Sequence, residues 1–429
     1  MEKAKKVPTL LQEISSPKYL RKAWGALNKA NKNSKGLNNE TIEEFQNALE
    51  TNLLSISKKL KNNTYKFNKV RGVLISKKEK GKFRPLRIAD VGDRLVCKAI
   101  SMKLDLLLTP LFNLNNEASF AYRKNKGIDD AIRKMIEHYK AGNKIILEAD
   151  IEKFFDKVDR TILLEKVFSN LPDPSLNNLI NDGLSQEVGN INEDSLDAHH
   201  FDDSANGIPQ GNALSPLFAN VYLSEFDSKI LLAGYKLVRY ADDFVILCTT
   251  KADSLSALEL CKQILETDLK LTIHKLGEAN DPNSKTKIID PIYNEFKFLS
   301  IRFDGKSVWV DRKKVLQLRE KIREITNTDN IPDLISILSK TRNLLEGWLA
   351  SFKFVDVDRD IEAIDSYIND QLCSVFRKFG FNIKTKHLKE IKDSKGLVTY
   401  TFSIEQRKRT GIKACASFLN SIDRKKIII

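Results

Sequence analysis

The segment Lys236-Leu-Val-Arg-Tyr-Ala-Asp-Asp-Phe-Val-Ile-Leu247 decides the fold of this chain. Two short apolar, β-branched runs flank the four residues from Tyr240 to Asp243, a pattern typical of a tight hairpin between buried strands. The carboxylates of Asp242 and Asp243 therefore lie at a hairpin tip, where they face solvent or a cleft. Such a pair alone indicates no more than a turn, because Asp tolerates turn geometry.

A further acidic group ends a strand upstream. Residues 144–149, Lys-Ile-Ile-Leu-Glu-Ala, are predicted to form a buried strand that ends at Asp150. If Asp150 meets the hairpin tip, three carboxylates converge, and like charges in close contact raise one another's pKa. Carboxylates together with substrate phosphates suit Mg²⁺. Two such ions, roughly 3.5–4 Å apart, stabilise the attacking and leaving oxygens of a phosphoryl displacement.

The rest of the pattern predicts an α+β fold with helical segments at both ends. The elements expected from periodicity are helices within the first 65 residues, a basic hairpin over 72–88, helices over 93–108 (ending at Pro110), 127–141, 159–170, 216–230 and 253–270, a strand over 296–299, a last hairpin around Asp304 and Gly305, and helices over 311–375. Residues 183–206 are polar and irregular, which indicates an insertion.

Charge is concentrated at the two ends. Of the 429 residues, 41% are hydrophobic, enough for two or three domains, and the net charge is +14. Residues 1–80 hold 18 Lys/Arg against 7 Asp/Glu, and residues 380–429 hold 12 against 4, so the middle is slightly acidic. A phosphate backbone is a natural partner for basic arms, because each neutralised phosphate releases counterions. Lysine-rich ends that only aid solubility explain the charge equally well.

Several other classes of protein are disfavoured. No apolar run approaches the roughly 18 residues of a membrane span, and the N-terminus lacks a signal-peptide core, so we expect a cytoplasmic protein with no membrane partner. The five cysteines are scattered and form no Cys-x-x-Cys pair, which argues against a disulfide framework or a zinc site. His199 and His200 could bind a metal, although a solvated surface insertion is the favoured interpretation.

Seven blocks in order resemble the reverse-transcriptase family, particularly its bacterial group II intron-like branch, over roughly residues 70–305. The blocks are Lys82-Phe-Arg-Pro-Leu86 with Asp93-Arg94, Ser119-Phe-Ala-Tyr-Arg123, Ala149-Asp-Ile-Glu-Lys-Phe-Phe-Asp156, Gly207-Ile-Pro-Gln-Gly-Asn-Ala-Leu-Ser-Pro-Leu-Phe-Ala-Asn-Val-Tyr-Leu223, Arg239-Tyr-Ala-Asp-Asp-Phe-Val-Ile-Leu247, Lys285-Thr-Lys-Ile288 and Phe298-Leu-Ser-Ile301. A lone YADD is common by chance, whereas this series is specific. The sequence departs from the family at Ser300, where a Gly is frequent, and at Arg87-Ile-Ala, where a Gly-Ile-Pro is frequent.

The resemblance implies a right-hand polymerase fold, with an antiparallel palm sheet that carries the YADD hairpin. The implied parts are a basic helical extension over 1–65, fingers over 66–144, a palm over 145–305 with the insertion near 183–206, a helical thumb over 306–376 and a basic C-terminal extension over 377–429.

The resemblance also implies roles for individual residues at the metal site. Asp150 and Asp242 would hold two Mg²⁺ ions, with Mn²⁺ as an alternative ion. Asp243 would complete the site, and the Ile151 carbonyl would assist. Phe155 matches an aromatic gate against the 2′-hydroxyl of a ribonucleotide, and its alternative is a plain core residue.

The remaining candidates would bind the nucleotide. Arg84 and Lys77 match fingers cations that clamp a triphosphate, although Lys78, Lys80 and Lys82 compete with Lys77 for register. Gln210 matches the PQG glutamine, and Pro209 and Gly211 would shape the loop that carries it. Tyr240 would have the same structural role in the YADD hairpin. Lys285 matches a proton donor to the departing pyrophosphate, and a surface role is its alternative.

The implied function is RNA-directed DNA synthesis from dNTPs on an RNA template. Because neither an endonuclease tail nor retron-type or RNase H signatures are visible, we expect a stand-alone bacterial enzyme that works with a structured noncoding RNA in antiphage defence. The alternatives are an RNA-dependent RNA polymerase, a template-independent polymerase of the same fold, and a non-catalytic, maturase-like RNA-binding protein. The retained aspartates, together with Gln210 and Arg84, weigh against the last.

Overall fold

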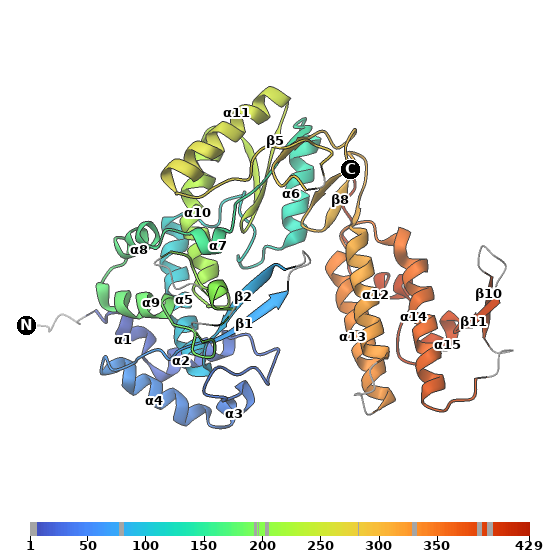
Figure 1. Cartoon of the computed structure of the whole chain (residues 1–429), viewed down its shortest axis with the longest axis horizontal. Helices are drawn as coiled ribbons and strands as arrows, with labels where there is room; N and C mark the ends of the chain where they lie inside the picture. The colour runs from blue at the N-terminus through green and yellow to red at the C-terminus, as the bar shows by residue number, and fades with distance from the viewer. Residues whose placement is uncertain are drawn as a thin grey trace, which may run out of the picture. The chain divides into compact units, whose positions relative to one another are not determined.

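The structure is a computed structural model that describes residues 7–76, 81–192, 195, 197–201, 206–281, 283–327, 333–383, 388–392 and 398–429. The chain divides into two compact units, Met1–Ile288 and Ile289–Ile429 (Figure 1). Within the described ranges, no helix combines the length and the apolar character that a bilayer crossing requires.

The first unit begins with short helices that pack against one long helix. These elements are α1 (Leu10–Ile14), α2 (Pro17–Ala26), α3 (Ile42–Asn47), α4 (Leu49–Lys61) and α5 (Val91–Leu111). The hydroxyls of Thr9, Ser16 and Thr41 cap α1, α2 and α3 by accepting a first-turn amide hydrogen. The expected end of the fifth helix at Pro110 is wrong, because the Phe112 amide still bonds the Leu108 carbonyl (2.9 Å) and the helix runs to Leu111.

The basic hairpin consists of β1 (Arg71–Ser76) and β2 (Phe83–Ile88), which pair antiparallel. The start of the predicted insertion docks on it. Val188 forms a parallel bridge with Val70, and the Asn190 side chain bonds both the amide (2.7 Å) and the carbonyl (3.1 Å) of Gly72. We expected residues 183–206 to form a solvated surface insertion. The described part of this segment instead packs on the hairpin, because the side-chain amide of Asn190 satisfies the backbone hydrogen-bonding groups of Gly72.

The centre of the first unit is a four-stranded sheet in the order β4-β5-β3-β6. Its strands are β3 (Ile145–Asp150), β4 (Lys236–Tyr240), β5 (Asp243–Cys248) and β6 (Lys287–Ile289). Residues 244–248 are all buried, as expected for a continuous apolar run in a central strand. Helices α6 (Ile128–Lys140), α10 (Ser215–Leu232) and α11 (Lys251–Lys262) pack against the sheet (Figure 1).

The remaining helices of this unit are short: α7 (Phe154–Lys157), α8 (Arg160–Phe168), η1 (Pro174–Leu176), α9 (Asn177–Leu184), η2 (Ala198–Phe201) and η3 (Gln263–Asp268). The helix expected over 253–270 is α11 continued by η3, a π-helical segment. The chain leaves η3 at Leu269, whose carbonyl accepts a hydrogen bond from the buried Tyr222 hydroxyl (2.6 Å).

The second unit joins a small sheet to a group of helices. Strands β7 (Phe296–Phe298), β8 (Ile301–Phe303) and β9 (Val308–Val310) pair antiparallel. Between β7 and β8, Leu299 and Ser300 have φ of 51° and 69°. This left-handed conformation favours glycine, which explains why a Gly is frequent in the family at the position of Ser300. The helices are α12 (Arg312–Thr326), α13 (Leu334–Phe352) and α14 (Asp358–Lys378).

The last part of the chain packs on these helices. It contains β10 (Lys389–Lys392), β11 (Val398–Thr401), α15 (Ile404–Arg409) and α16 (Cys415–Leu419). The fully buried Arg407 bonds Asp365 of α14 (2.6 Å), and the Ile427 amide bonds the Phe354 carbonyl (2.8 Å). The described part of the basic C-terminal segment is thus built into the second unit.

Candidate active site

Two of the predicted aspartates face each other in the central sheet. Strand β3 ends at Asp150 and β5 begins at Asp243, and these residues are direct partners in the antiparallel ladder. On its other side, Asp243 is paired with Tyr240 at the end of β4, so Ala241 and Asp242 form the connecting turn. The structure therefore brings Asp150, Asp242 and Asp243 to one end of the sheet.

The pKa shifts show that these carboxylates act on one another. Burial, together with the charges of Asp242 and Asp150, raises the pKa of Asp243 to about 7, and the charge of Lys285 opposes the increase. Burial also raises the pKa of Asp242; the charge of Asp150 adds to the increase, and the charge of Arg84 opposes it. Repulsion of this kind is what a bound cation relieves.

The donor set fits Mg²⁺ in part. Among the described residues, no three His, Cys, Asp or Glu side chains are already gathered at metal-binding distance, His199 and His200 included. Mg²⁺, however, is usually bound through only one or two protein carboxylates. Water and substrate phosphates fill the rest of its coordination shell. Oxygen donors from two adjacent strands suit such an ion. Ile151 is buried and forms an isolated bridge with Ile273 beside the site.

A cationic group lies directly on Asp150. The ammonium of Lys285 is 2.9 Å from Asp150 Oδ2, and His274 Nε2 lies 3.4 Å from the same ammonium. The other ring nitrogen of His274 is 3.3 Å from Glu152 Oε1. Sequence reasoning identified Lys285 but missed His274, because no motif marks the irregular segment that contains the histidine. Glu152 belongs to the block from Ala149 to Asp156 but was given no role.

Phe155 and Gln210 line a common cavity of about 270 Å³, together with Pro209. The neighbouring Phe154 is only 1% exposed and belongs to the core, and its ring meets the Phe155 ring edge to face at 5.6 Å. The two adjacent phenylalanines therefore have different surroundings, and Phe155 is the one that reaches the cavity.

Of the two predicted triphosphate-binding cations, the structure describes Arg84 but not Lys77. Arg84 is exposed on β2, and its charge acts on Asp242. Lys77 lies outside the described residues, as do Lys78 and Lys80.

The PQG loop is held against β2. The Arg87 amide donates to the Gln210 carbonyl (2.9 Å), and the Ser215 hydroxyl donates to the Pro209 carbonyl (2.7 Å). Gly211 has φ of 106°, and a Cβ there would lie 2.7 Å from the Arg87 carbonyl oxygen. Glycine is therefore required at this position by both conformation and space.

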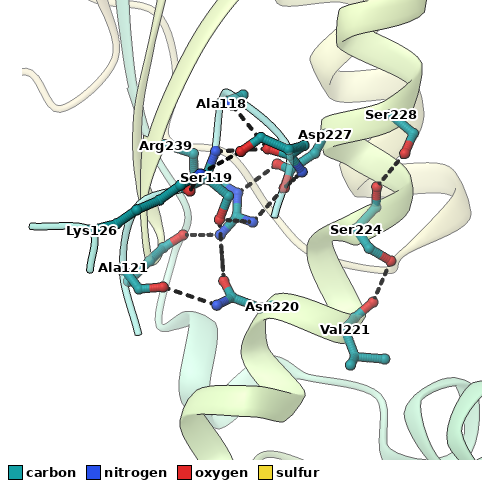
Figure 2. A network of polar contacts seen from close by, with 12 residues as sticks. Ala118, Ser119, Ala121, Lys126, Asn220, Val221, Ser224, Asp227, Ser228 and Arg239 are labelled. Atoms are coloured by element: carbon teal, nitrogen blue, oxygen red, sulfur yellow. Dashed lines mark hydrogen bonds and ion pairs between the residues drawn. The ribbon is translucent and has the colours of Figure 1, made fainter. Parts of the chain in front are cut away.

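A buried polar network behind the YADD hairpin escaped sequence reasoning (Figure 2). Its centre is Arg239, which follows the buried Leu237 and Val238 in β4. The signal that could have identified it is a charged residue that directly follows two apolar residues of a buried strand.

A family model described as "Reverse transcriptase (RNA-dependent DNA polymerase)" matches residues 75–303, more than half of the chain. This chain belongs to the reverse transcriptase family and has the right-hand polymerase fold that its motifs imply.

Among known proteins, the chain is similar to the group II intron-encoded protein LtrA of Lactococcus lactis subsp. cremoris, with 30% identity over 206 residues, which are 48% of this chain and 32% of LtrA. It is also 25% identical over 319 residues to protein YkfC of Escherichia coli K12, over 64% of this chain and 81% of YkfC. A solved structure titled "Partial Cas6-RT-Cas1--Cas2 complex" aligns with 26% identity over 61% of this chain and 43% of that chain, at a TM-score of 0.35. The matched segment thus spans about a third of LtrA, and the expected likeness to the group II intron-like branch is confirmed.

Proposed function

We propose that this chain is an RNA-directed DNA polymerase that extends a primer with dNTPs on an RNA template. The observation that carries the proposal is the register of the central sheet, which pairs Asp150 with Asp243 and leaves Asp242 in the adjoining turn. Membership of the reverse transcriptase family supports the same activity.

Each residue then has a defined task. Asp150, Asp242 and Asp243 would hold the divalent ions that this family generally uses, and the Ile151 carbonyl would assist. When bound, Mg²⁺ supplies positive charge to the attacking and leaving oxygens. Lys285, beside Asp150, would donate a proton to the departing pyrophosphate.

The nucleotide would lie between the fingers hairpin and the cavity of Phe155. Arg84 and Lys77 would bind its triphosphate, and Gln210 would contact the nucleotide from the PQG loop. Phe155 would exclude the 2′-hydroxyl of a ribonucleotide. The cavity that Phe155 and Gln210 share supports this assignment.

The proposed organisation follows the family. Residues 66–144 act as fingers, 145–305 as the palm and 306–376 as the thumb, flanked by the basic segments 1–65 and 377–429. We infer that the partner is a structured noncoding RNA, that the role is antiphage defence, and that the enzyme works in the bacterial cytoplasm. The net charge of +14, concentrated at the two ends, supports an RNA partner.

The test is primer extension on an RNA template with the double variant Asp242→Ala, Asp243→Ala. We expect incorporation to be abolished while RNA affinity stays close to that of the wild type. Asp182→Ala, an exposed aspartate on α9, is the control and should extend primers normally. A double variant that still incorporates dNTPs at the wild-type rate refutes the proposal. A product that ignores the added template identifies a template-independent polymerase, and preserved biological activity of the double variant identifies an RNA-binding protein.

A further inference from the structure

A guanidinium group lies completely buried behind the proposed catalytic hairpin. The side chain of Arg239 is 0% exposed, and that of Asp227 on α10, its ion-pair partner, is 1% exposed. A buried charge is costly unless it is paired and its hydrogen bonds are satisfied. The environment of Arg239 meets both conditions.

All five N–H groups of this guanidinium have an acceptor (Figure 2). Nε donates to Asp227 Oδ1 and Nη2 to Asp227 Oδ2, both at 2.6 Å. The second Nη2 hydrogen goes to Ser119 Oγ (2.9 Å), and the Nη1 hydrogens go to Asn220 Oδ1 (3.2 Å) and to the Ala241 carbonyl (2.9 Å). Only the last of these acceptors belongs to the YADD turn.

Ala241 adopts a backbone conformation that is unfavourable for a residue with a Cβ. Its φ is 61°, in the left-handed region that residues with a Cβ rarely adopt. The Ala241 carbonyl belongs to the peptide group that joins Ala241 to Asp242. The orientation of this peptide therefore affects the position of the Asp242 side chain. The bond from Arg239 ties this peptide to α10 through Asp227 and to the segment around Ser119.

We infer that Arg239 is a positioning residue for the catalytic hairpin. By holding the Ala241 carbonyl it keeps the Asp242 carboxylate in place relative to Asp150, and so sets the affinity of the site for divalent ions. This inference rests on the proposed function and deepens it. A lysine at this position keeps the charge beside Asp227 but has three donors on a single nitrogen, so it cannot satisfy the same five acceptors.

The comparison of Arg239→Lys with Ser119→Ala tests the inference. Ser119→Ala removes the hydroxyl that accepts from Arg239 (2.9 Å) and donates to Asn220 (3.5 Å), and it leaves the bond to Ala241 in place. We measure Mn²⁺ binding to the full chain by calorimetry without nucleic acid, the Mg²⁺ concentration for half-maximal primer extension, and the melting temperature. We expect Arg239→Lys to weaken Mn²⁺ binding and to raise the Mg²⁺ requirement by about 10- to 100-fold. Ser119→Ala should change both by less than about twofold.

A second comparison separates positioning from general loss of stability. Arg407 of α15 is also fully buried and bonds Asp365, so Arg407→Lys makes the same chemical change within the second unit. It should lower the melting temperature and leave Mn²⁺ binding unchanged. If Arg239→Lys fails to fold, Asp227→Asn carries the same expectation, because it loosens the same fork with almost no change in volume.

The outcomes distinguish this inference from the proposed function. If the wild type binds Mn²⁺ and the Asp242→Ala, Asp243→Ala variant does not, the proposed metal site stands. A folded Arg239→Lys or Asp227→Asn variant with wild-type Mn²⁺ affinity then overturns the role of Arg239 alone. If the wild type and the double aspartate variant bind Mn²⁺ alike, the proposed metal site itself is refuted.

Discussion

The ammonium of Lys285 lies 2.9 Å from Asp150 Oδ2, although the two residues are 135 positions apart in the chain. Lys285 immediately precedes Thr286 and β6, which flanks β3 in the central sheet. Because β6 is the neighbour of β3, the ammonium of Lys285 lies beside Asp150 at the end of β3. This contact favours a role for Lys285 in the site over a plain surface position.

Replacing Lys285 with Met should slow single-turnover nucleotide incorporation by about 100-fold, because a positioned general acid contributes about 10²–10⁴-fold. Lys285→Arg should remain slow, since arginine keeps the charge but does not release a proton at neutral pH. Lys287→Met is the matched control, two residues along and paired with Glu148 at 3.6 Å. Equal rates for Lys285→Met and the wild type would return Lys285 to a surface role.

Truncation of Phe155 should change the choice of sugar. Because Phe155 lines the cavity and Phe154 is in the core, Phe155→Ala should raise the ratio of ribonucleotide to deoxyribonucleotide incorporation with little loss of stability. Phe154→Ala should instead destabilise the fold by about 3–5 kcal/mol, the usual cost of emptying a buried phenylalanine site. Competition between dGTP and GTP measures the first effect and urea unfolding the second. An unchanged sugar ratio in Phe155→Ala contradicts the gate.

Metal binding should weaken below neutral pH. The pKa of Asp243 is about 7, against an ordinary 3.8, so a proton competes with the ion at this carboxylate. We expect Mn²⁺ affinity to fall by up to about tenfold per pH unit below 7. Calorimetry at several pH values measures this dependence, which Asp243→Asn should flatten.

Without divalent ions, the free energy of unfolding should increase as the pH falls, whereas metal affinity decreases. The folded chain binds the proton of Asp243 more tightly than the unfolded chain does, so this group adds stability as the pH falls from about 7 towards 4. Because Asp243 retains contact with solvent, the effect should be modest. Urea unfolding with a chelator should show it, and a wild type whose stability matches Asp243→Asn at every pH contradicts the raised pKa.

Gly211→Ala should lower the free energy of unfolding by more than the left-handed backbone conformation at this position alone would cost. Gly211 and Gly142 have similar φ values, 106° and 102°, but only Gly211 has an atom where its Cβ would be, the Arg87 carbonyl oxygen at 2.7 Å. Gly142→Ala therefore measures the conformational cost alone, about 1 kcal/mol. We expect Gly211→Ala to cost more in urea unfolding and to raise the KM for dNTPs. Equal costs at the two positions would mean that the loop shifts freely away from β2.

Arg407→Ala should destabilise the second unit by about 3–5 kcal/mol, because it leaves the carboxylate of Asp365 buried without its partner. Arg409, exposed on the same helix, provides the control, and Arg409→Ala should fall within about 0.5 kcal/mol of the wild type. Denaturant unfolding followed by circular dichroism measures both. A small effect of Arg407→Ala would show that α15 does not support α14.

Much of this protein could be predicted from local sequence. The YADD hairpin, the strand that ends at Asp150 and the long amphipathic helices follow from turn chemistry and from apolar spacing over a few residues. The order of the motif blocks added the family, and with it the right-hand fold. These features depend on neighbours in the chain, which the sequence lists directly.

Other features were decided only by tertiary structure. The pairing of Asp150 with Asp243, the approach of His274 to Asp150, the docking of Asn190 on Gly72 and the bond from Arg239 to Ser119 join segments far apart in the chain. Their formation depends on strand register and on which polar groups lose water together, and neither quantity is encoded in any short window. Local spacing therefore specified which carboxylates were candidates, and long-range packing determined which groups surround and hold them.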